Sequence, residues 1–405
     1  MKIKRTMLKS FNKTAIMKIL MERESVYRAE ISRLTGLSIP TVMKITDDFE
    51  KVGLISGIGK GVSSGGKPPE LLQLIPNARF FIGVDLRGKE FQCSIINLRG
   101  EVQCHHSLPS PVARLSEASS EDATTQTLIE LVKQTIDRSG VDRNRIVGIG
   151  IGVPYPVDVS AGKVVSAKEL SWENFDIVTP VTEAFGLPVI LENTAKVVAL
   201  GERWFGHGVD EQNFAVITIG SGVGCAIITD GDIYSGTSNM SGEFGHMVVD
   251  VDGPPCRCGN NGCLEAIASV KALELYAKTR ILEGTESKLA ELNDWTTKNI
   301  CEIARRGDPL ANEALDRMLY YIAIGVTNLV NLLDIHLILM TGRIVEAYPV
   351  ICEKLTQMVN RRRGNYFGNA RIVIQPLRIG TNAATIGAAT LLIKRLVEGG
   401  GLFIS

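Results

Sequence analysis

The sequence of 405 residues lacks an apolar run of the roughly 18–20 residues that a membrane-spanning helix needs. Its basic start, MKIKRTMLKS, is not followed by the apolar core of a secretion signal. We therefore expect no membrane partner, no export and a cytoplasmic, reducing location. Disulfides are not expected there, so clustered cysteines point to a metal instead.

The chain also lacks net charge, because 44 Lys and Arg balance 44 Asp and Glu. The balance hides an asymmetry: residues 1–75 hold thirteen Lys or Arg and seven Asp or Glu, a net charge of +6. A basic head on an acidic body predicts a module that binds a polyanion, attached to a domain with another task.

Helical patterns are present in this basic head. They cover Lys9 to Glu22, Tyr27 to Thr35, and a third helix that opens at Ser38 with Pro40 in its first turn. The stretch LTGLSIPTV then predicts a helix, a glycine-containing turn and a second helix. GLISGIGKG and GGKPPELLQL predict two strands around a glycine-rich loop, the wing of a winged helix-turn-helix.

The pattern predicts DNA binding, with a small protein-interaction module of three helices as the alternative. The third helix would place its N-terminal end in the major groove of operator DNA, and the wing would approach the duplex closely. The predicted contacts are Ser38, Thr41, Lys44, Gly65, Gly66 and Lys67.

The body carries one strand pattern twice. Phe80–Val102 and Phe214–Gly236 each contain strand-rich runs separated by turns with glycine. Further strands are predicted at Ile146–Val153, Pro188–Leu191, Leu337–Thr341 and Arg371–Gln375, and helices at Thr194–Phe205 and Ala383–Leu396. The mixed order indicates an α/β fold of two similar lobes.

Three of the eight cysteines fall within CRCGNNGCLE, ten residues after the histidine of GEFGH. His246, Cys256, Cys258 and Cys263 make a Cys₃His set that suits a structural, tetrahedral Zn²⁺. Gly259 and Gly262 would permit the tight bends. The alternative is a loop of free cysteines, as expected for the five scattered ones.

These motifs, in this order, resemble the ROK family of repressors, open reading frames and sugar kinases. The residues that carry the likeness are IGVDLRG, ENTAKVVALGE, TIGSGVGCAII, GEFGHM and CRCGNNGCLE, behind a winged head. The resemblance implies the two-lobed, actin-like (ribonuclease H-like) sugar-kinase fold, and it assigns zinc to the same four residues. Within this family, a chain with an N-terminal winged head resembles the xylose, glucose-responsive and N-acetylglucosamine repressors.

The resemblance also implies a sugar site at Asn193, Glu243, His246 and Glu265. Carboxylates accept hydroxyl hydrogens, and an asparagine amide both donates and accepts, which suits a polyol. Zinc on one ring nitrogen of His246 would orient the other nitrogen toward the ligand. The ligand is expected to be a sugar or a sugar phosphate.

Two departures from the family pattern argue against an enzyme. Where the kinases have a general base, this chain has Thr194, and a threonine has no useful pKa for that role. In the first phosphate loop, DLRGK, Arg87 stands in place of a glycine that lets the backbone approach phosphate.

We therefore predict a sugar-responsive ROK repressor that controls carbohydrate-uptake or catabolism genes, such as those of xylose metabolism. Its domains would be a winged head at 1–75, a first lobe at 76–190 completed by 381–405, and a second lobe at 191–380 with the zinc loop. A homodimer or dimer of dimers would bind a pseudo-palindromic operator. The alternatives are a sugar kinase with residual activity, and a repressor controlled by a phosphotransferase-system protein.

Overall fold

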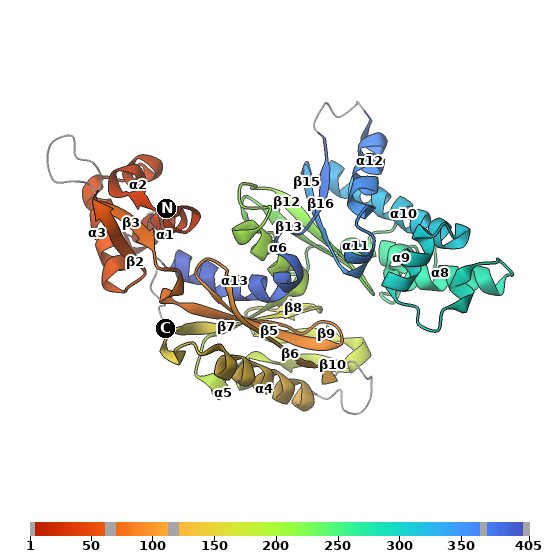
Figure 1. Cartoon of the computed structure of the whole chain (residues 1–405), viewed down its shortest axis with the longest axis horizontal. Helices are drawn as coiled ribbons and strands as arrows, with labels where there is room; N and C mark the ends of the chain where they lie inside the picture. The colour runs from red at the N-terminus through yellow and green to blue at the C-terminus, as the bar shows by residue number, and fades with distance from the viewer. Residues whose placement is uncertain (1–4, 61–69, 112–120, 365–370, 400–405) are drawn as a thin grey trace. The chain divides into compact units, whose positions relative to one another are not determined.

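The computed structural model describes residues 5–60, 70–111, 121–364 and 371–399. The chain forms two compact units, Met1–Val197 with Ala384–Ser405, and Val198–Ala383 (Figure 1). Among the described helices, none combines the length and the apolar character that crossing a membrane requires.

The first unit begins with helices and a small antiparallel sheet. The elements are α1 Arg5–Glu22, β1 Val26–Tyr27, α2 Arg28–Thr35, α3 Ile39–Lys51, β2 Ile55–Lys60 and β3 Glu70–Leu74. Strand β3 pairs with both β1 and β2. The two residues of β1 were not predicted from the sequence, because so short a strand has no periodicity of its own. Gly36 ends α2 at a positive φ of 68°, which a glycine adopts without strain.

Apolar side chains at helical spacing form the core of this segment. Ile16 and Leu20 of α1 and Val42, Ile45 and Phe49 of α3 are buried, whereas Ile19, on the same predicted stripe of α1, is half-buried. Ser38 is the N-cap residue of α3, but its hydroxyl makes no capping hydrogen bond to the helix backbone. It lies 2.9 Å from the Thr41 hydroxyl instead, so the helix starts where expected without the expected cap.

The rest of the first unit is a layered α/β lobe. Its five-stranded sheet has the order β11-β7-β4-β5-β6 within the described residues. The strands are β4 Phe80–Asp85, β5 Glu90–Asn97, β6 Val102–Pro109, β7 Ile146–Val153 and β11 Val189–Asn193, and the smaller sheet contains β8 Val157–Asp158, β9 Lys163–Ala167 and β10 Trp172–Asp176. Helices α4 Glu121–Ser139 and α5 Val178–Phe185 cover one face, and α13 Ala383–Glu398 covers the other (Figure 1).

Glycines in the strands bring α13 directly onto the sheet. A Cβ atom on Gly83 of β4 would collide with the carbonyl oxygen of Thr385, and one on Gly150 of β7 would collide with that of Ala388. The glycines of IGVD and GIGIG are therefore needed for the close approach of helix and strand backbones.

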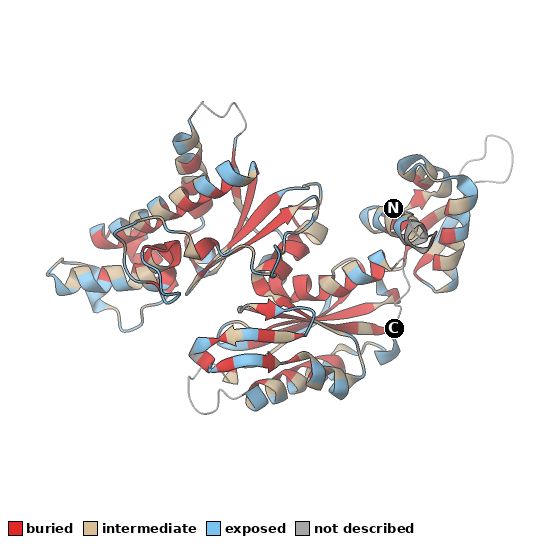
Figure 2. Cartoon of the chain, turned by 180° about the vertical axis from the view of Figure 1, so that it is seen from behind, coloured by how far each residue is buried: buried red, intermediate tan, exposed pale blue. Residues whose placement is uncertain are grey.

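The second unit repeats this design. Its five-stranded sheet has the order β14-β13-β12-β15-β16 in the described part of the chain. The strands are β12 Phe214–Ile219, β13 Val223–Thr229, β14 Asp232–Ile233, β15 Leu337–Thr341 and β16 Val373–Pro376. The helices are α6 Thr194–Phe205, which spans the division of the units, α7 Leu264–Ala268, α8 Val270–Leu282, α9 Thr297–Arg305, α10 Pro309–Leu333, α11 Arg343–Ala347 and α12 Ile351–Arg363. Figure 2 shows the buried residues concentrated on the strands and on the helix faces that pack against them.

Both large sheets have the same connectivity. In each, the first strand pairs antiparallel with the second and parallel with the fourth, and the third and fifth strands lie at the edges. The prediction of two similar α/β lobes is therefore confirmed at the level of strand order.

Candidate metal and effector site

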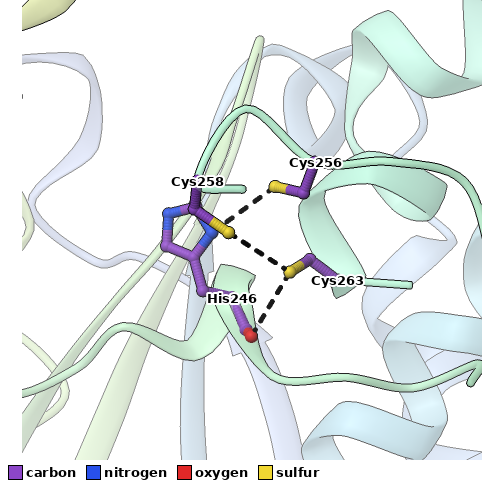
Figure 3. A group of neighbouring side chains, drawn as sticks. All are labelled: His246, Cys256, Cys258 and Cys263. Carbon is purple, nitrogen blue, oxygen red and sulfur yellow. Dashed lines mark hydrogen bonds between the residues drawn. The ribbon is translucent and has the colours of Figure 1, made fainter. Parts of the chain in front are cut away.

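Four side chains of the second unit converge at the start of α7. His246 ends a short 3₁₀ helix, Phe244–His246, and Cys263 is the N-cap residue of α7. Cys256 and Cys258 lie in the loop between them. Figure 3 shows all four side chains pointing toward one another, and their ligand atoms lie within 4.8 Å of one another.

The distances fit a tetrahedral zinc ion. Cys258 Sγ lies 3.7 Å from Cys263 Sγ, and Cys256 Sγ lies 3.6 Å from His246 Nδ1. Zinc–sulfur bonds of about 2.3 Å and zinc–nitrogen bonds of about 2.0 Å give tetrahedron edges of about 3.8 Å and about 3.6 Å. The donor set and its spacing therefore suit one metal ion with every position filled by protein.

Backbone hydrogen bonds hold the loop in this form. Cys256 N donates to Asn260 O at 2.7 Å, and Gly259 N donates to Cys256 O at 3.0 Å. Gly259 and Gly262 have φ values of 96° and 69°, as predicted for residues that make tight bends. At Gly262, a Cβ atom would also collide with the Asp250 carbonyl oxygen, so this position admits no side chain.

The thiols differ in acidity. Burial raises the pKa of Cys263 to about 12, whereas a backbone hydrogen bond involving Asn260 lowers the pKa of Cys258. A metal binds the thiolate, so binding must displace a proton from Cys263, and metal affinity falls as the pH falls.

Of the predicted sugar residues, His246 belongs to this cluster and Glu243 lies beside it. Because Nδ1 of His246 faces Cys256, Nε2 is the nitrogen left to face outward, and it lies 3.8 Å from Glu243 Oε2. The side chain of Glu243 is 54% exposed, so it is open to a ligand.

Glu265, the third predicted sugar residue in this unit, is held at both oxygens. Oε2 accepts a hydrogen bond from Val223 N at 2.9 Å, and Oε1 lies 2.9 Å from Nε of Arg257. The carboxylate is buried, so these contacts fix its orientation.

The fourth predicted sugar residue, Asn193, belongs to the first unit, at the end of β11. Its Oδ1 accepts from Ala195 N at 2.9 Å, and its Nδ2 donates to Tyr155 O at 3.3 Å. Both ends of the amide are therefore oriented by the backbone, and each retains capacity for one more hydrogen bond.

The predicted departures from a kinase site lie together in the first unit. Asp85 is buried, and the side chain of Arg87 folds back onto it, with Nε 3.0 Å from Oδ1 and 2.9 Å from Oδ2. Burial raises the pKa of Asp85, and Arg87 and, to a smaller extent, the hydroxyl of Thr194 oppose that rise. Thr194 is itself buried.

The predicted DNA contacts on α3 lie at its N-terminal end. Ser38 and Lys44 are exposed, and Thr41 is half-buried. Gly65, Gly66 and Lys67, the predicted contacts of the wing, lie outside the described residues.

The acidic residues of α3 all face cations. Arg28, at the start of α2, lies 3.2 Å from Asp47 and 2.9 Å from Glu50, and Lys13 lies 3.9 Å from Asp48. These ion pairs offset the negative charge of the helix that would approach DNA. Arg28 also pairs with Glu70 of β3 at 2.6 Å and so joins the two helices to the wing strand.

The sequence alone did not reveal Arg28 or Arg257. The partners of Arg28 are Asp47, Glu50 and Glu70, which lie 19, 22 and 42 residues away along the chain. The partner of Arg257 is Glu265. The only signal for Arg257 was its place between two predicted zinc ligands.

Comparison with known proteins identifies the family to which the chain belongs. The ROK family model matches residues 81–395. The xylose repressor of Bacillus spizizenii is 30% identical over 97% of this chain and 97% of its own length. Among solved structures, a ROK family transcriptional regulator, a homologue of the Escherichia coli MLC protein, covers 98% of both chains with a TM-score of 0.84 and 26% identity.

A kinase matches less of the chain. The ROK family glucokinase from Streptomyces griseus, solved with glucose and AMPPNP, has a TM-score of 0.62 and 26% identity. It covers 77% of this chain but 98% of its own. The repressors thus match nearly all of this chain, and the kinase does not.

The duplicated lobes and the match to solved ROK regulator and kinase structures define a protein of the two-lobed sugar-kinase fold. The chain belongs to the ROK family. Its full-length relatives place it among the transcriptional repressors of that family.

Proposed function

We propose that this protein represses transcription by binding operator DNA through the head at residues 1–75, under the control of a sugar effector. One observation carries the proposal. The family model that repressors and kinases share begins at residue 81, whereas the full-length match to a repressor covers 97% of the chain. The segment before residue 81 is therefore the part that repressors have and kinases lack, as expected of a DNA-binding head.

Contacts in the head support DNA binding. Helices α2 and α3 are separated by a short turn at Gly36, and β2 and β3 flank the predicted wing. Ser38, Thr41 and Lys44 would face base edges and phosphates from the N-terminal half of α3, and Gly65, Gly66 and Lys67 would approach the backbone from the wing. A homodimer or dimer of dimers would present two such heads to a pseudo-palindromic site.

Zinc would be held by His246, Cys256, Cys258 and Cys263. With every ligand from the protein, it has a structural role, fixing the loop between Gly245 and Leu264. Because it would bind Nδ1 of His246, it would also set the tautomer that leaves Nε2 for a sugar hydroxyl.

The effector would be a sugar or sugar phosphate held by Asn193, Glu243, His246 and Glu265. D-xylose is the first candidate, because the relatives that match the full chain at 29–30% identity are named xylose repressors. Carbohydrate-uptake or catabolism genes are then the expected targets, and a cytoplasmic location stays a prediction.

Loss of kinase activity is the second part of the proposal. Arg87 neutralises Asp85 in the first phosphate loop, and Thr194 supplies no base. The competing kinase function predicts ATP consumption with a preferred sugar, which an assay of the purified protein detects directly.

The decisive experiment combines thermal unfolding with DNA binding. The zinc-loaded protein is heated with D-xylose, D-glucose, N-acetylglucosamine and their phosphates, and the active sugar is then added to a complex with a DNA duplex selected from a random pool. A sugar at about 100 times its dissociation constant should add roughly 2.7 kcal/mol to the free energy of unfolding. It should also change operator affinity at least about tenfold.

Two results would overturn parts of this proposal. If no selected duplex binds above the level of random DNA, the chain is not an operator-binding repressor. If DNA binds but no sugar stabilises the protein, the effector is not a sugar of this panel, and control by a phosphotransferase-system protein becomes the better hypothesis.

A further inference from the structure

Arg257 lies between two of the predicted zinc ligands, and its backbone is fixed on both sides. The turn is closed by the hydrogen bonds from Cys256 N to Asn260 O and from Gly259 N to Cys256 O. A metal bound by Cys256 and Cys258 would hold the same turn from its side chains. The metal loop therefore fixes the backbone position of Arg257, and with it the point from which its side chain extends.

The side chain reaches the buried carboxylate of Glu265. Nε of Arg257 lies 2.9 Å from Oε1, where 64% of the arginine side chain but only 11% of the glutamate side chain is exposed. The other oxygen, Oε2, accepts the hydrogen bond from Val223 N, at the start of β13. The carboxylate plane is thus fixed at two points, one on the metal loop and one on the central sheet.

Glycine makes this arrangement possible. A Cβ atom on Gly222 would collide with Oε2 of Glu265, and it would lie 3.6 Å from Nη2 of Arg257. The glycine loop, the carboxylate and the guanidinium are therefore in close contact, and the orientation of Glu265 depends on all three.

We propose that Arg257 is a positioning residue that orients Glu265 for the sugar and links the metal loop to effector binding. This inference rests on the proposed role of Glu265 as a sugar ligand. A carboxylate offers about four lone-pair directions, and Arg257 and Val223 N occupy two of them. The others are held in fixed directions before the sugar arrives, so no ordering entropy of this side chain is lost on binding. The guanidinium also offsets the negative charge of the Glu265 carboxylate.

The first experiment measures sugar affinity by calorimetry on the zinc-loaded, full-length protein, with D-xylose as the probe. Arg257→Ala should weaken binding about tenfold, and Arg257→Lys should recover part of the loss, because an ammonium can still pair with Oε1. Arg143→Ala is the matched control, because 64% of the Arg143 side chain is also exposed and it pairs only distantly with Asp137, at 3.9 Å. Its effect should stay below about twofold.

A double-mutant cycle tests whether the effect passes through Glu265. In a Glu265→Gln background, Arg257→Ala should change affinity by less than about twofold, because the charged partner is gone. An equal tenfold loss in both backgrounds, or tighter sugar binding by Arg257→Ala alone, would overturn the inference.

The second experiment needs no sugar. If Arg257 orients Glu265, its loss should weaken the hydrogen bond that Val223 N donates, so amide hydrogen exchange at Val223 should accelerate in Arg257→Ala and not in Arg143→Ala. Unchanged exchange would overturn the positioning role. If no sugar binds the wild type but exchange accelerates, the positioning role stands and the proposed sugar function fails.

Discussion

The pair of Asp85 and Arg87 bears on the proposed loss of kinase activity. A glycine at position 87 would leave the buried carboxylate open toward a ligand. Here the guanidinium contacts both carboxylate oxygens and occupies that side. In the predicted phosphate loop, an ion pair therefore occupies the side of Asp85 that a glycine at position 87 would leave open, as the proposed loss of kinase activity requires.

Removing Arg87 should make stability more sensitive to pH. Burial raises the pKa of Asp85 and Arg87 opposes the rise, so in Arg87→Ala the pKa moves higher. A carboxyl with a raised folded-state pKa contributes most below its unfolded value of about 3.9, and that contribution is lost as the pH rises through the folded value. Denaturant unfolding should show a loss of roughly 3–5 kcal/mol near neutral pH that shrinks toward pH 4.

The control for this prediction is the double variant Arg87→Ala with Asp85→Asn, which removes the charge as well as its partner. It should recover most of the stability near neutral pH. A loss that does not depend on pH would mean that Arg87 acts through packing alone.

The residues of the metal cluster could be predicted because they lie in one short stretch, 246–263, where spacing along the chain determines their distances. Arg257 could not be assigned a partner in this way. Its contact with Glu265 depends on the direction of α7 and on the approach of the Gly222 loop, which only the folded second unit determines.

Among the elements, the metal loop depends on glycine for its shape. Gly262→Ala should abolish zinc binding and lower the free energy of unfolding by several kcal/mol, because its Cβ atom collides with the Asp250 carbonyl and its φ is 69°. Gly259→Ala is the matched control, since its φ is also positive, at 96°, but apart from the adjoining residues no atom of the described chain lies within 4 Å of the added Cβ. It should cost only about 1–2 kcal/mol of backbone strain and retain the metal.

Zinc content by atomic absorption and unfolding by denaturant check this pair of variants. Equal zinc content in both would show that the collision at Gly262 is relieved elsewhere. Loss of stability without loss of zinc would show that the loop folds independently of its metal.

Helices Thr194–Phe205 and Ala383–Leu396 and the strands with predicted bounds agree with the structure within a few residues, whereas no bounds were predicted for α4, α8, α9, α10 and α12. Strands Ile146–Val153 and Leu337–Thr341 and helix Thr194–Phe205 match their predicted bounds. The short strands β1 and β8 to β10 were missed. Each is defined by its pairing with a neighbour, and the sequence pattern carries no trace of that pairing.

At the scale of the whole molecule, the head is distinguished by its positive charge and the body by its duplicated fold. The two sheets of the same order account for the body, and the net charge of +6 is confined to residues 1–75. Within the head, ion pairs to Arg28 and Lys13 offset the acids of α3, which leaves Lys44 exposed at the proposed DNA face. Electrostatics should therefore dominate the affinity of the head for DNA.

The salt dependence of operator binding tests this distribution of charge. Each phosphate contact contributes about −0.9 to the slope of log affinity against log salt, so Lys44→Ala should make the slope shallower by about 0.9 for each head that binds. A dimer should show twice that change, and affinity should fall by a similar factor on every DNA sequence, because a phosphate contact reads no bases.

Lys133→Ala, on the exposed surface of α4 in the body, should leave the slope unchanged. If both variants change the slope equally, DNA contacts extend over the body and the assignment to the head is wrong. If Lys44→Ala changes sequence preference but not the slope, Lys44 contacts base edges rather than phosphates.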